Sequence, residues 1–243
     1  EFTPNTANLI KEAVGKYFDE SEFAVFLGGP EVGAEFTALP LDHLLYTGSG
    51  NIAKKVVANA AKNLVPTTLE LGGKSPTIIA SDANLELVAK RIMFVKTLNA
   101  GQICLSPDYV LVKKGMEDQL IAELKKVFNT FYPENDSSDY TSMVNDHHHN
   151  RMHEYLTDAK EKGAKVIDLG NFDSNEKNTM ATKVLLDVND GMRVMQEEIF
   201  GPLLPVMVYE DLSEAVSYVN DHDHPLGLYF FGNKKSEQNF VIN

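Results

Sequence analysis

Short apolar runs alternate with amphipathic segments of helical length in the first part of the chain. Strands are predicted over 22–29, 42–47 and 66–71, because each is a compact apolar run that ends in or near a turn residue. The segments between them predict helices over 30–38, where a proline opens the first turn, and over 52–64. Strands that alternate with helices through glycine-rich turns are typical of βαβ units, so the sequence predicts a parallel sheet.

The rest of the chain continues the alternation less regularly. The segment 84–98 has a clear helical period, since its apolar residues fall on one face. The stretch 129–142 carries turn formers and acids and predicts an exposed loop. The regular rhythm ends at the glycine pair 72–73, which predicts a boundary between domains 1–72 and 73–243. Further strands are predicted over 75–80, 108–112, 165–169, 182–188, 203–209 and 227–232, and further helices over 116–128, 147–162 and 212–220.

Composition narrows the class of protein. A chain of 243 residues with 43% hydrophobic residues is long enough to bury a sizeable core. Its formal charge of −13 argues against a protein that tracks nucleic-acid phosphates. No apolar run approaches the roughly 18 residues that span a bilayer, so no membrane segment is expected. A single cysteine excludes an internal disulfide framework and favours a reducing compartment such as the cytoplasm.

The glycine turn in "YTGSGNIAKKV" lies between a predicted strand and a predicted helix. Free N–H groups at the start of a helix favour a phosphate or another anion, and Ser49 next to Gly48 can add a hydroxyl donor. An ordinary strand-to-helix turn explains the same pattern and is favoured on this motif alone. The glycines of "LGGPEVGAEF" at 27–36 carry the same two interpretations.

Glu70 in "TLELGGK" follows an apolar strand and precedes two glycines. Ligands of open α/β folds gather at the carboxyl edge of the sheet. Partial burial there raises the pKa of a carboxyl group toward the range of a general base. The alternative is an ordinary acid at the end of a strand, and the local pattern favours it.

Cys104 in "NAGQICLSPDYVLV" lies between a predicted helix and a predicted strand. A thiolate is the strongest side-chain nucleophile near neutral pH, and a loop can expose it. Free cysteine is also among the most buried residue types, so the local pattern by itself favours a packed, inert thiol.

The segment "QEEIFGPLLPV" places Glu197 and Glu198 next to each other before Phe200. Side chains alternate in direction along an extended chain, so one acid is expected to face a site while the other faces solvent. An exposed Phe200 can stack on a planar ligand. A turn with two solvated acids explains the segment equally well.

Together, these four segments resemble the aldehyde dehydrogenase superfamily, in that family's order and approximate spacing. "LELGGKSP", "NAGQICLSPDYVLV" and "EEIFGPLLPV" look like its most specific signatures. The continuation "SPDY" is similar to the class 3-like branch, and "DHLLYTGSG" with "AAKNLVPTTLELGGKSP" is most similar to the coniferyl aldehyde dehydrogenase group within it. The resemblance covers essentially the whole chain.

The resemblance implies a covalent reaction on an aldehyde substrate. Cys104 matches the family nucleophile, which attacks the aldehyde carbonyl to form a thiohemiacetal, and hydride transfer to the nicotinamide then leaves a thioester. Glu70 matches the acid that activates the water molecule that hydrolyses this thioester. The expected activity is therefore NAD(P)-dependent oxidation of an aromatic or long-chain aldehyde to a carboxylic acid.

The resemblance also implies a cofactor site. Glu198 matches the carboxylate that holds the nicotinamide ribose, and Phe200 matches the aromatic residue beside it. Gly48 and Ser49 match the turn that faces the pyrophosphate. Glu1 matches the acid of a "KPSE" motif that binds the adenine ribose, which favours NAD, with NADP as the alternative.

Two departures from the family qualify these expectations. The family turn usually carries a glycine where this chain has Ala53. Family chains are also much longer, so this chain is expected to be an internal fragment. It would hold the second half of a Rossmann-like cofactor domain and an α/β catalytic domain truncated at its C-terminus. The isolated chain is expected to be inactive, and its parent is expected to be a homodimer.

Two other functions and one metal site compete with this interpretation. A CoA-acylating semialdehyde dehydrogenase is disfavoured by Glu70, and a non-catalytic structural protein on the same fold is disfavoured by Glu70 and Cys104 together. His149 and His153 stand four residues apart, a spacing that can chelate zinc. No acid, cysteine or third histidine is placed to complete that site, so a solvated start to the helix is favoured and no metal is expected.

Overall fold

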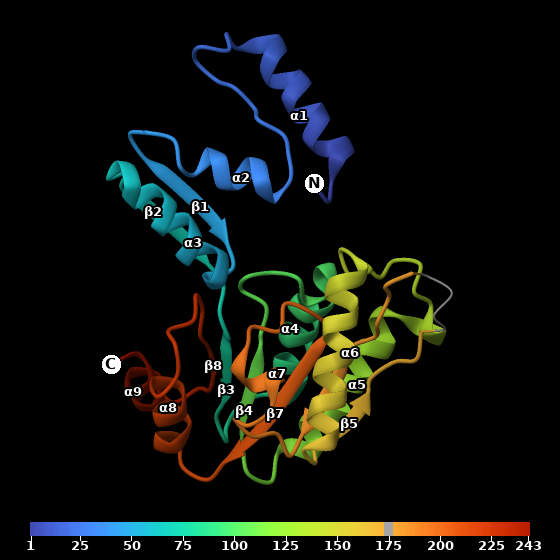
Figure 1. Cartoon of the computed structure of the whole chain (residues 1–243). Helices are drawn as coiled ribbons and strands as arrows, with labels where there is room; N and C mark the ends of the chain where they lie inside the picture. Colours follow the sequence, from blue (N-terminus) through green and yellow to red (C-terminus); the bar gives the residue numbers. More distant parts are fainter. Residues whose placement is uncertain (173–176) are drawn as a thin grey trace. The chain divides into compact units, whose positions relative to one another are not determined.

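The computed structural model describes residues 1–172 and 177–243. The chain divides into two compact units, Glu1–Leu71 and Gly72–Asn243. In Figure 1, where the colours follow the sequence, unit 1 is blue to cyan and unit 2 runs from green to red. No helix in these two ranges is long and apolar enough to cross a membrane.

Unit 1 is built around two parallel strands and the helix that connects them. Ser49 caps that helix, since its hydroxyl oxygen accepts a hydrogen bond from the backbone N–H of Ile52. A small core forms where Leu44, Val56 and Ala60 pack together. The elements are α1 (Pro4–Tyr17), α2 (Pro30–Phe36), β1 (Leu44–Gly48), α3 (Gly50–Ala60), η1 (Ala61–Asn63) and β2 (Thr67–Leu71).

The predicted strand over 22–29 is wrong. Residues 24–29 form no strand, and the side chains of Phe23 and Phe26 are exposed. A strand needs a hydrogen-bonded neighbour, and β1 pairs with β2 alone in the described chain, so this apolar run has no ladder to join. The helix α1 was not predicted from the sequence.

Unit 2 contains a six-stranded sheet with the order β5-β6-β7-β4-β3-β8. The pairs β6–β7, β7–β4, β4–β3 and β3–β8 are parallel, as the sequence predicts. The edge pair β5–β6 is antiparallel and departs from that prediction. The central strands are buried on both faces, which explains their continuous apolar runs. The strands are β3 (Pro76–Ile79), β4 (Tyr109–Lys113), β5 (Lys165–Asp168), β6 (Lys183–Leu186), β7 (Leu203–Tyr209) and β8 (Tyr229–Phe231).

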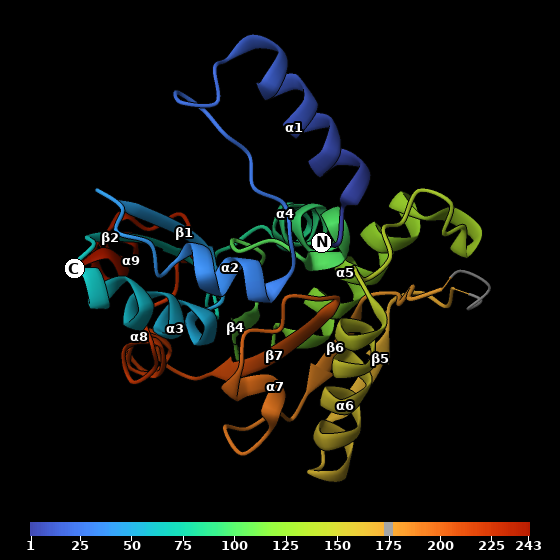
Figure 2. The ribbon, with the colours of Figure 1, turned by 45° about the horizontal axis from the view of Figure 1, so that its top comes forward.

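Helices cover this sheet on both faces. Figure 2 shows α6 and α7 in front of the sheet and α4 and α5 behind it. Asn84 and Asn145 cap α4 and α6, because each side-chain oxygen accepts a backbone N–H of the first turn. The helices are α4 (Leu85–Thr97), η2 (Leu98–Gly101), α5 (Glu117–Phe131), η3 (Pro133–Asn135), α6 (Asp146–Glu161), α7 (Arg193–Gln196), α8 (Leu212–Asn220) and α9 (Lys235–Ile242).

The predicted exposed loop over 129–142 is only partly present. The helix α5 continues to Phe131, and η3 follows it. Tyr140 is buried, with its ring centroid 4.8 Å from that of Phe172 and 6.4 Å from that of Phe128. Aromatic packing therefore anchors a stretch whose polar composition predicts exposure. The helices α7 and α9 were also not predicted.

Candidate active site

The segment after α4 presents the only cysteine of the chain. Asn99, Ala100 and Gly101 have φ angles of 53°, 54° and 74°, so three successive residues adopt the left-handed conformation. Such backbone is strained for residues other than glycine and persists only where its surroundings fix it. The thiol of Cys104 follows this turn and is exposed. The local interpretation of Cys104 as a packed thiol is therefore wrong.

Residues 99–105, which we call the thiol segment, are held in place by the side chain of Gln102. Its side-chain amide N–H donates to the carbonyl oxygens of Asn99 at 2.9 Å and Ser142 at 3.2 Å. Its amide oxygen accepts the backbone N–H of Val144 at 2.9 Å. The amide of Asn99 in turn donates to the carbonyl of Gln102 at 3.0 Å. These bonds offset the strain of the turn and fix the direction in which the chain reaches Cys104.

A second segment, residues 197–201, lies against the thiol segment within unit 2. We call it the acid-pair segment. A Cβ atom on Gly101 would lie 2.5 Å from the carbonyl oxygen of Gly201, so only glycine fits where the two segments meet. The exposed thiol and the two acids are thus parts of one local structure.

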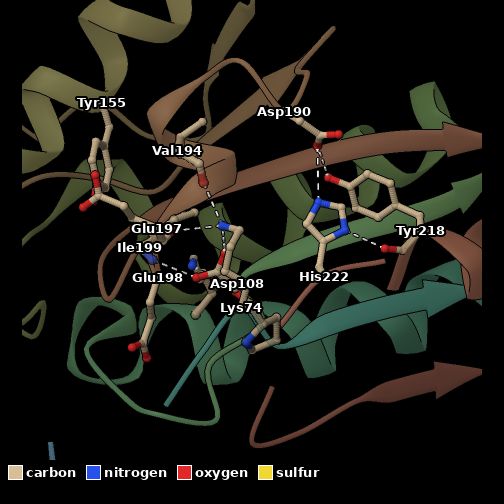
Figure 3. Close-up of polar contacts among 12 residues, drawn as sticks. Lys74, Asp108, Tyr155, Asp190, Val194, Glu197, Glu198, Ile199, Tyr218 and His222 are labelled. Atoms are coloured by element: carbon tan, nitrogen blue, oxygen red, sulfur yellow. Dashed lines mark hydrogen bonds and ion pairs between the residues drawn. The ribbon is translucent and has the colours of Figure 1, made fainter. Parts of the chain in front are cut away.

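A buried ion pair anchors the acid-pair segment (Figure 3). The ammonium of Lys74 pairs with one carboxylate oxygen of Asp108. The same ammonium donates to the carbonyl oxygens of Val194 at 2.7 Å and Glu197 at 3.1 Å. The other oxygen of Asp108 accepts the backbone N–H of Ile199 at 2.8 Å. Lys74 and Asp108 lie within the quoted signatures, yet no local pattern of residues predicts this role for them.

Glu198 is half-buried beside the glycine pair that opens unit 2. Its carboxylate accepts the backbone N–H of Gly73, and a Cβ on Gly72 would lie 2.1 Å from a Glu198 oxygen. Burial raises the pKa of Glu198, and the nearby Asp108 charge acts in the same direction. A cavity of about 380 Å³, lined in part by Lys74, Glu198 and Tyr109, opens beside this carboxylate. A carboxylate placed over bare backbone at a cavity can accept the hydroxyl groups of a sugar.

The two neighbouring acids differ in exposure, since Glu198 is half-buried at the cavity and Glu197 is exposed. Glu197 accepts a hydrogen bond from the phenol of Tyr155 at 2.8 Å. Glu197 therefore faces solvent, as expected for one of the two acids, and its carboxylate also binds a tyrosine 42 residues away. Phe200 has a φ of 47° and is 37% exposed, so a strained backbone presents its ring.

Tyr229, on β8, binds the backbone of the thiol segment. Its phenol donates to the carbonyl oxygen of Leu105 at 2.6 Å. Burial raises the pKa of Tyr229, and the Cys104 sulfur adds to the rise. Tyr229 thus remains a neutral donor near the thiol at physiological pH.

The other expected site residues belong to unit 1. Gly48 ends β1, and Thr47 and Glu70 are register partners on the paired strands, so Gly48 and Glu70 lie near the same carboxyl edge. The side chain of Glu70 is exposed rather than partly buried. Ser49 uses its oxygen as the α3 cap, as described above. Glu1 is exposed at the first residue.

His149 and His153 lie on α6 with their ring centroids 4.7 Å apart. Burial lowers the pKa of His153, and the positive field of His149, Lys183 and Lys160 lowers it further. Within residues 1–172 and 177–243, no three His, Cys, Asp or Glu side chains gather as a metal site.

These features define an α/β protein with a mainly parallel sheet, in which the segments that carry an exposed thiol and a half-buried carboxylate meet at Gly101 and Gly201. The chain belongs to the aldehyde dehydrogenase family, whose model matches residues 1–243. The resemblance and the expected fold class are confirmed.

Individual relatives agree with this assignment. The chain is 47% identical over 247 residues to a probable coniferyl aldehyde dehydrogenase of Caulobacter vibrioides, covering 100% of the chain and 51% of that protein. It is 45% identical over 247 residues to the coniferyl aldehyde dehydrogenase of a Pseudomonas species, with the same coverage. The substrate-bound state of AldH from Staphylococcus aureus matches with a TM-score of 0.93 and 38% identity, covering 100% of the chain and 53% of that structure. The chain thus spans about half the length of these relatives.

Proposed function

We propose that the full-length protein carrying this chain oxidises an aldehyde to a carboxylic acid, with NAD(P)⁺ as hydride acceptor and Cys104 as nucleophile. The observation that supports this most strongly is the exposed Cys104 on a strained turn that lies against the segment bearing Glu198. A thiol with only a structural role needs neither exposure nor three consecutive left-handed residues.

Cys104 performs the covalent chemistry in this proposal. Once the thiol proton has passed to solvent water, the sulfur gives an electron pair to the aldehyde carbon, forming a C–S bond, while the carbonyl oxygen takes the electrons of the former π bond. The backbone N–H of Cys104 is a candidate donor to this oxyanion. When the oxygen electrons return, the hydrogen on the former carbonyl carbon would leave as hydride, for which a bound nicotinamide would be the acceptor, and a thioester would remain on the sulfur.

Glu70 completes the turnover. Its carboxylate takes a proton from a water molecule whose oxygen attacks the thioester carbon. The C–S bond then breaks, the carboxylic acid leaves, and the proton held by Glu70 passes to the leaving sulfur, which regenerates the thiol of Cys104 and the carboxylate of Glu70. The exposure of Glu70 in unit 1 is compatible with access to water.

Glu198 and Phe200 hold the cofactor in this proposal. A half-buried carboxylate beside bare glycine backbone fits ribose hydroxyl groups, and an exposed ring fits the edge of a planar group. When bound, the nicotinamide supplies the hydride acceptor. Gly48, Ser49 and Glu1 are proposed to contact the rest of the dinucleotide. NAD is the preferred form, since Glu1 matches a residue that binds ribose hydroxyl groups.

The proposed substrate is an aromatic aldehyde, with a long-chain aldehyde as the second class. The names of the coniferyl aldehyde dehydrogenases among the relatives support the aromatic choice. The isolated chain is proposed to be inactive or nearly so, because half of the relatives' length is outside it and cofactor binding must align donor and acceptor. The full-length protein is proposed to be a homodimer.

A panel of aromatic and aliphatic aldehydes with NAD⁺ and NADP⁺ tests this function on the full-length protein. We expect NADH formation with aromatic aldehydes, and a loss of at least ~10³-fold in Cys104→Ala. Ser106→Ala is a matched control in the same segment and should keep its rate. Cys104→Ala with undiminished turnover would overturn the proposal.

A further inference from the structure

Arg151 on α6 forms hydrogen bonds to the backbone of the acid-pair segment. Its guanidinium donates to the carbonyl oxygen of Glu198 at 3.1 Å and to that of Ile199 at 2.8 Å. The two bonds use different terminal nitrogens, so the rigid fork of the guanidinium fixes both carbonyl groups at once. A lysine at this position has a single ammonium and would not reproduce the paired geometry.

Tyr155, one helical turn further along α6, holds the neighbouring acid. It is fully buried, its phenol donates to Glu197 at 2.8 Å, and its oxygen accepts from Arg151 at 3.1 Å. The guanidinium carbons of Arg151 and Arg193 each lie 5.3 Å from the centroid of its ring. Burial raises the pKa of Tyr155 to about 12, so the phenol stays a hydrogen-bond donor at neutral pH. Figure 3 shows Tyr155 directed at Glu197.

The acid-pair segment is therefore held at successive positions by atoms from one helix. Tyr155 fixes the carboxylate of Glu197, and Arg151 fixes the carbonyl oxygens of Glu198 and Ile199. These contacts leave the Glu198 carboxylate bonded to Gly73 and the Phe200 ring exposed. Phe200, whose backbone is left-handed, is the next residue after Ile199. The contacts of Arg151 and Tyr155 therefore also support the strained residue that presents the ring.

We infer that Arg151 and Tyr155 are positioning residues that set cofactor affinity by fixing how Glu198 and Phe200 are presented. The inference rests on the proposed function. Both side chains act through the acid-pair segment and not on the reacting carbon. Their loss should weaken cofactor binding and leave the chemistry at saturating cofactor nearly intact.

The test uses the full-length protein with Tyr155→Phe, Arg151→Met and Arg151→Lys. The KM for NAD⁺ and the Kd for NADH should rise ~3–5-fold in Tyr155→Phe and ~10-fold or more in Arg151→Met, with kcat within about twofold of the parent. Arg151→Lys should recover only part of the loss. Tyr132→Phe, a half-buried tyrosine in the cluster around Phe128 and Phe172, is the matched control and should bind NADH normally.

Two further measurements separate positioning from general damage. Modification of Cys104 by a thiol reagent without cofactor should proceed at the parent rate in Tyr155→Phe, because the thiol segment is held by Gln102 instead. Thermal unfolding identifies any variant that fails to fold, and Tyr155→Phe removes a single oxygen and keeps the ring. Parent-like NADH affinity in Tyr155→Phe and in folded Arg151→Met overturns the inference. A parent protein that binds neither NADH nor NADPH overturns the proposed function as well.

Discussion

The buried pair Lys74–Asp108 allows a quantitative test of what holds the acid-pair segment. The side chain of Asp108 is 4% exposed and that of Lys74 is 15% exposed. Asp108→Asn removes the negative charge while keeping the shape of the side chain. The ammonium of Lys74 then retains its two carbonyl acceptors, on Val194 and Glu197, and has lost its counter-charge.

The expected loss of stability is about 3–5 kcal/mol, the usual effect of removing one partner of a buried ion pair. A second buried cation makes the upper part of this range the expectation. Lys96 is fully buried and donates to the carbonyl oxygen of Pro107 at 3.0 Å. Burial lowers the pKa of Lys96 to about 8, and the charge of Asp108 opposes that lowering. Asp108→Asn therefore removes the counter-charge of two lysines.

Amide hydrogen exchange measures this change within unit 2 alone. Peptides from β3, β4 and β7 report its free energy of unfolding, and even the lower limit of ~3 kcal/mol corresponds to ~150-fold faster exchange. Lys74→Met and the double variant complete a thermodynamic cycle, with an expected coupling of about 2 kcal/mol or more. Glu86→Gln, which removes the exposed pair with Lys90, is the control and should change stability by less than ~0.5 kcal/mol. Additive single changes, or an Asp108→Asn effect as small as that of the control, would refute the reasoning.

Three further predictions concern the same site. Burial raises the pKa of the Glu198 carboxyl group in the folded protein. Its contribution to the free energy of unfolding is therefore fully present when the pH is below its pKa in the unfolded chain, and is lost as the pH rises through its pKa in the folded protein. The gain in urea midpoint of Glu198→Gln over the parent should thus be larger at about pH 7 than at about pH 4, and an equal gain at both contradicts the assignment. Cys104 should take up one equivalent of a thiol reagent in the native chain, and modification that requires denaturant contradicts its exposure. Gly101→Ala should destabilise unit 2 by ~2 kcal/mol or more, since its Cβ meets backbone at positive φ, whereas Gly72→Ala meets only the mobile end of Glu198 and should cost less. Equal losses for the two variants would contradict this comparison.

Elements with a full hydrophobic period were predicted well from the sequence. The strand Leu203–Tyr209 and the helix Leu212–Asn220 have the predicted bounds, because local patterns of apolar residues decide them. The run at 22–29 has the same apolar character and forms no strand, because pairing depends on a neighbour that its own residues do not encode. Similarly, the antiparallel edge at β5 depends on the path of the chain and not on composition.

The signature residues of the site were predictable from the sequence, but the residues that hold them in place were not. The motifs around Cys104 and Glu198 drew attention to both residues, but the exposure of Cys104 follows from left-handed backbone at Asn99 and Ala100, which ordinary residue types do not reveal. Arg151 and Tyr155 lie more than 40 residues from the carboxylate and carbonyl groups that they hold. Contacts at that separation are set by the packing of α6, which the sequence pattern predicts only as a helix.

A covalent acyl intermediate at Cys104 is the central step of the proposed function. The decisive measurement is mass spectrometry of the full-length Glu70→Gln variant after mixing with an aromatic aldehyde and NAD⁺, with NADH followed in parallel. We predict one equivalent of NADH per active site in a rapid burst, then slow turnover, with the acyl group on the peptide that contains Cys104. Steady NADH formation at the parent rate with an unmodified Cys104 peptide would contradict the account.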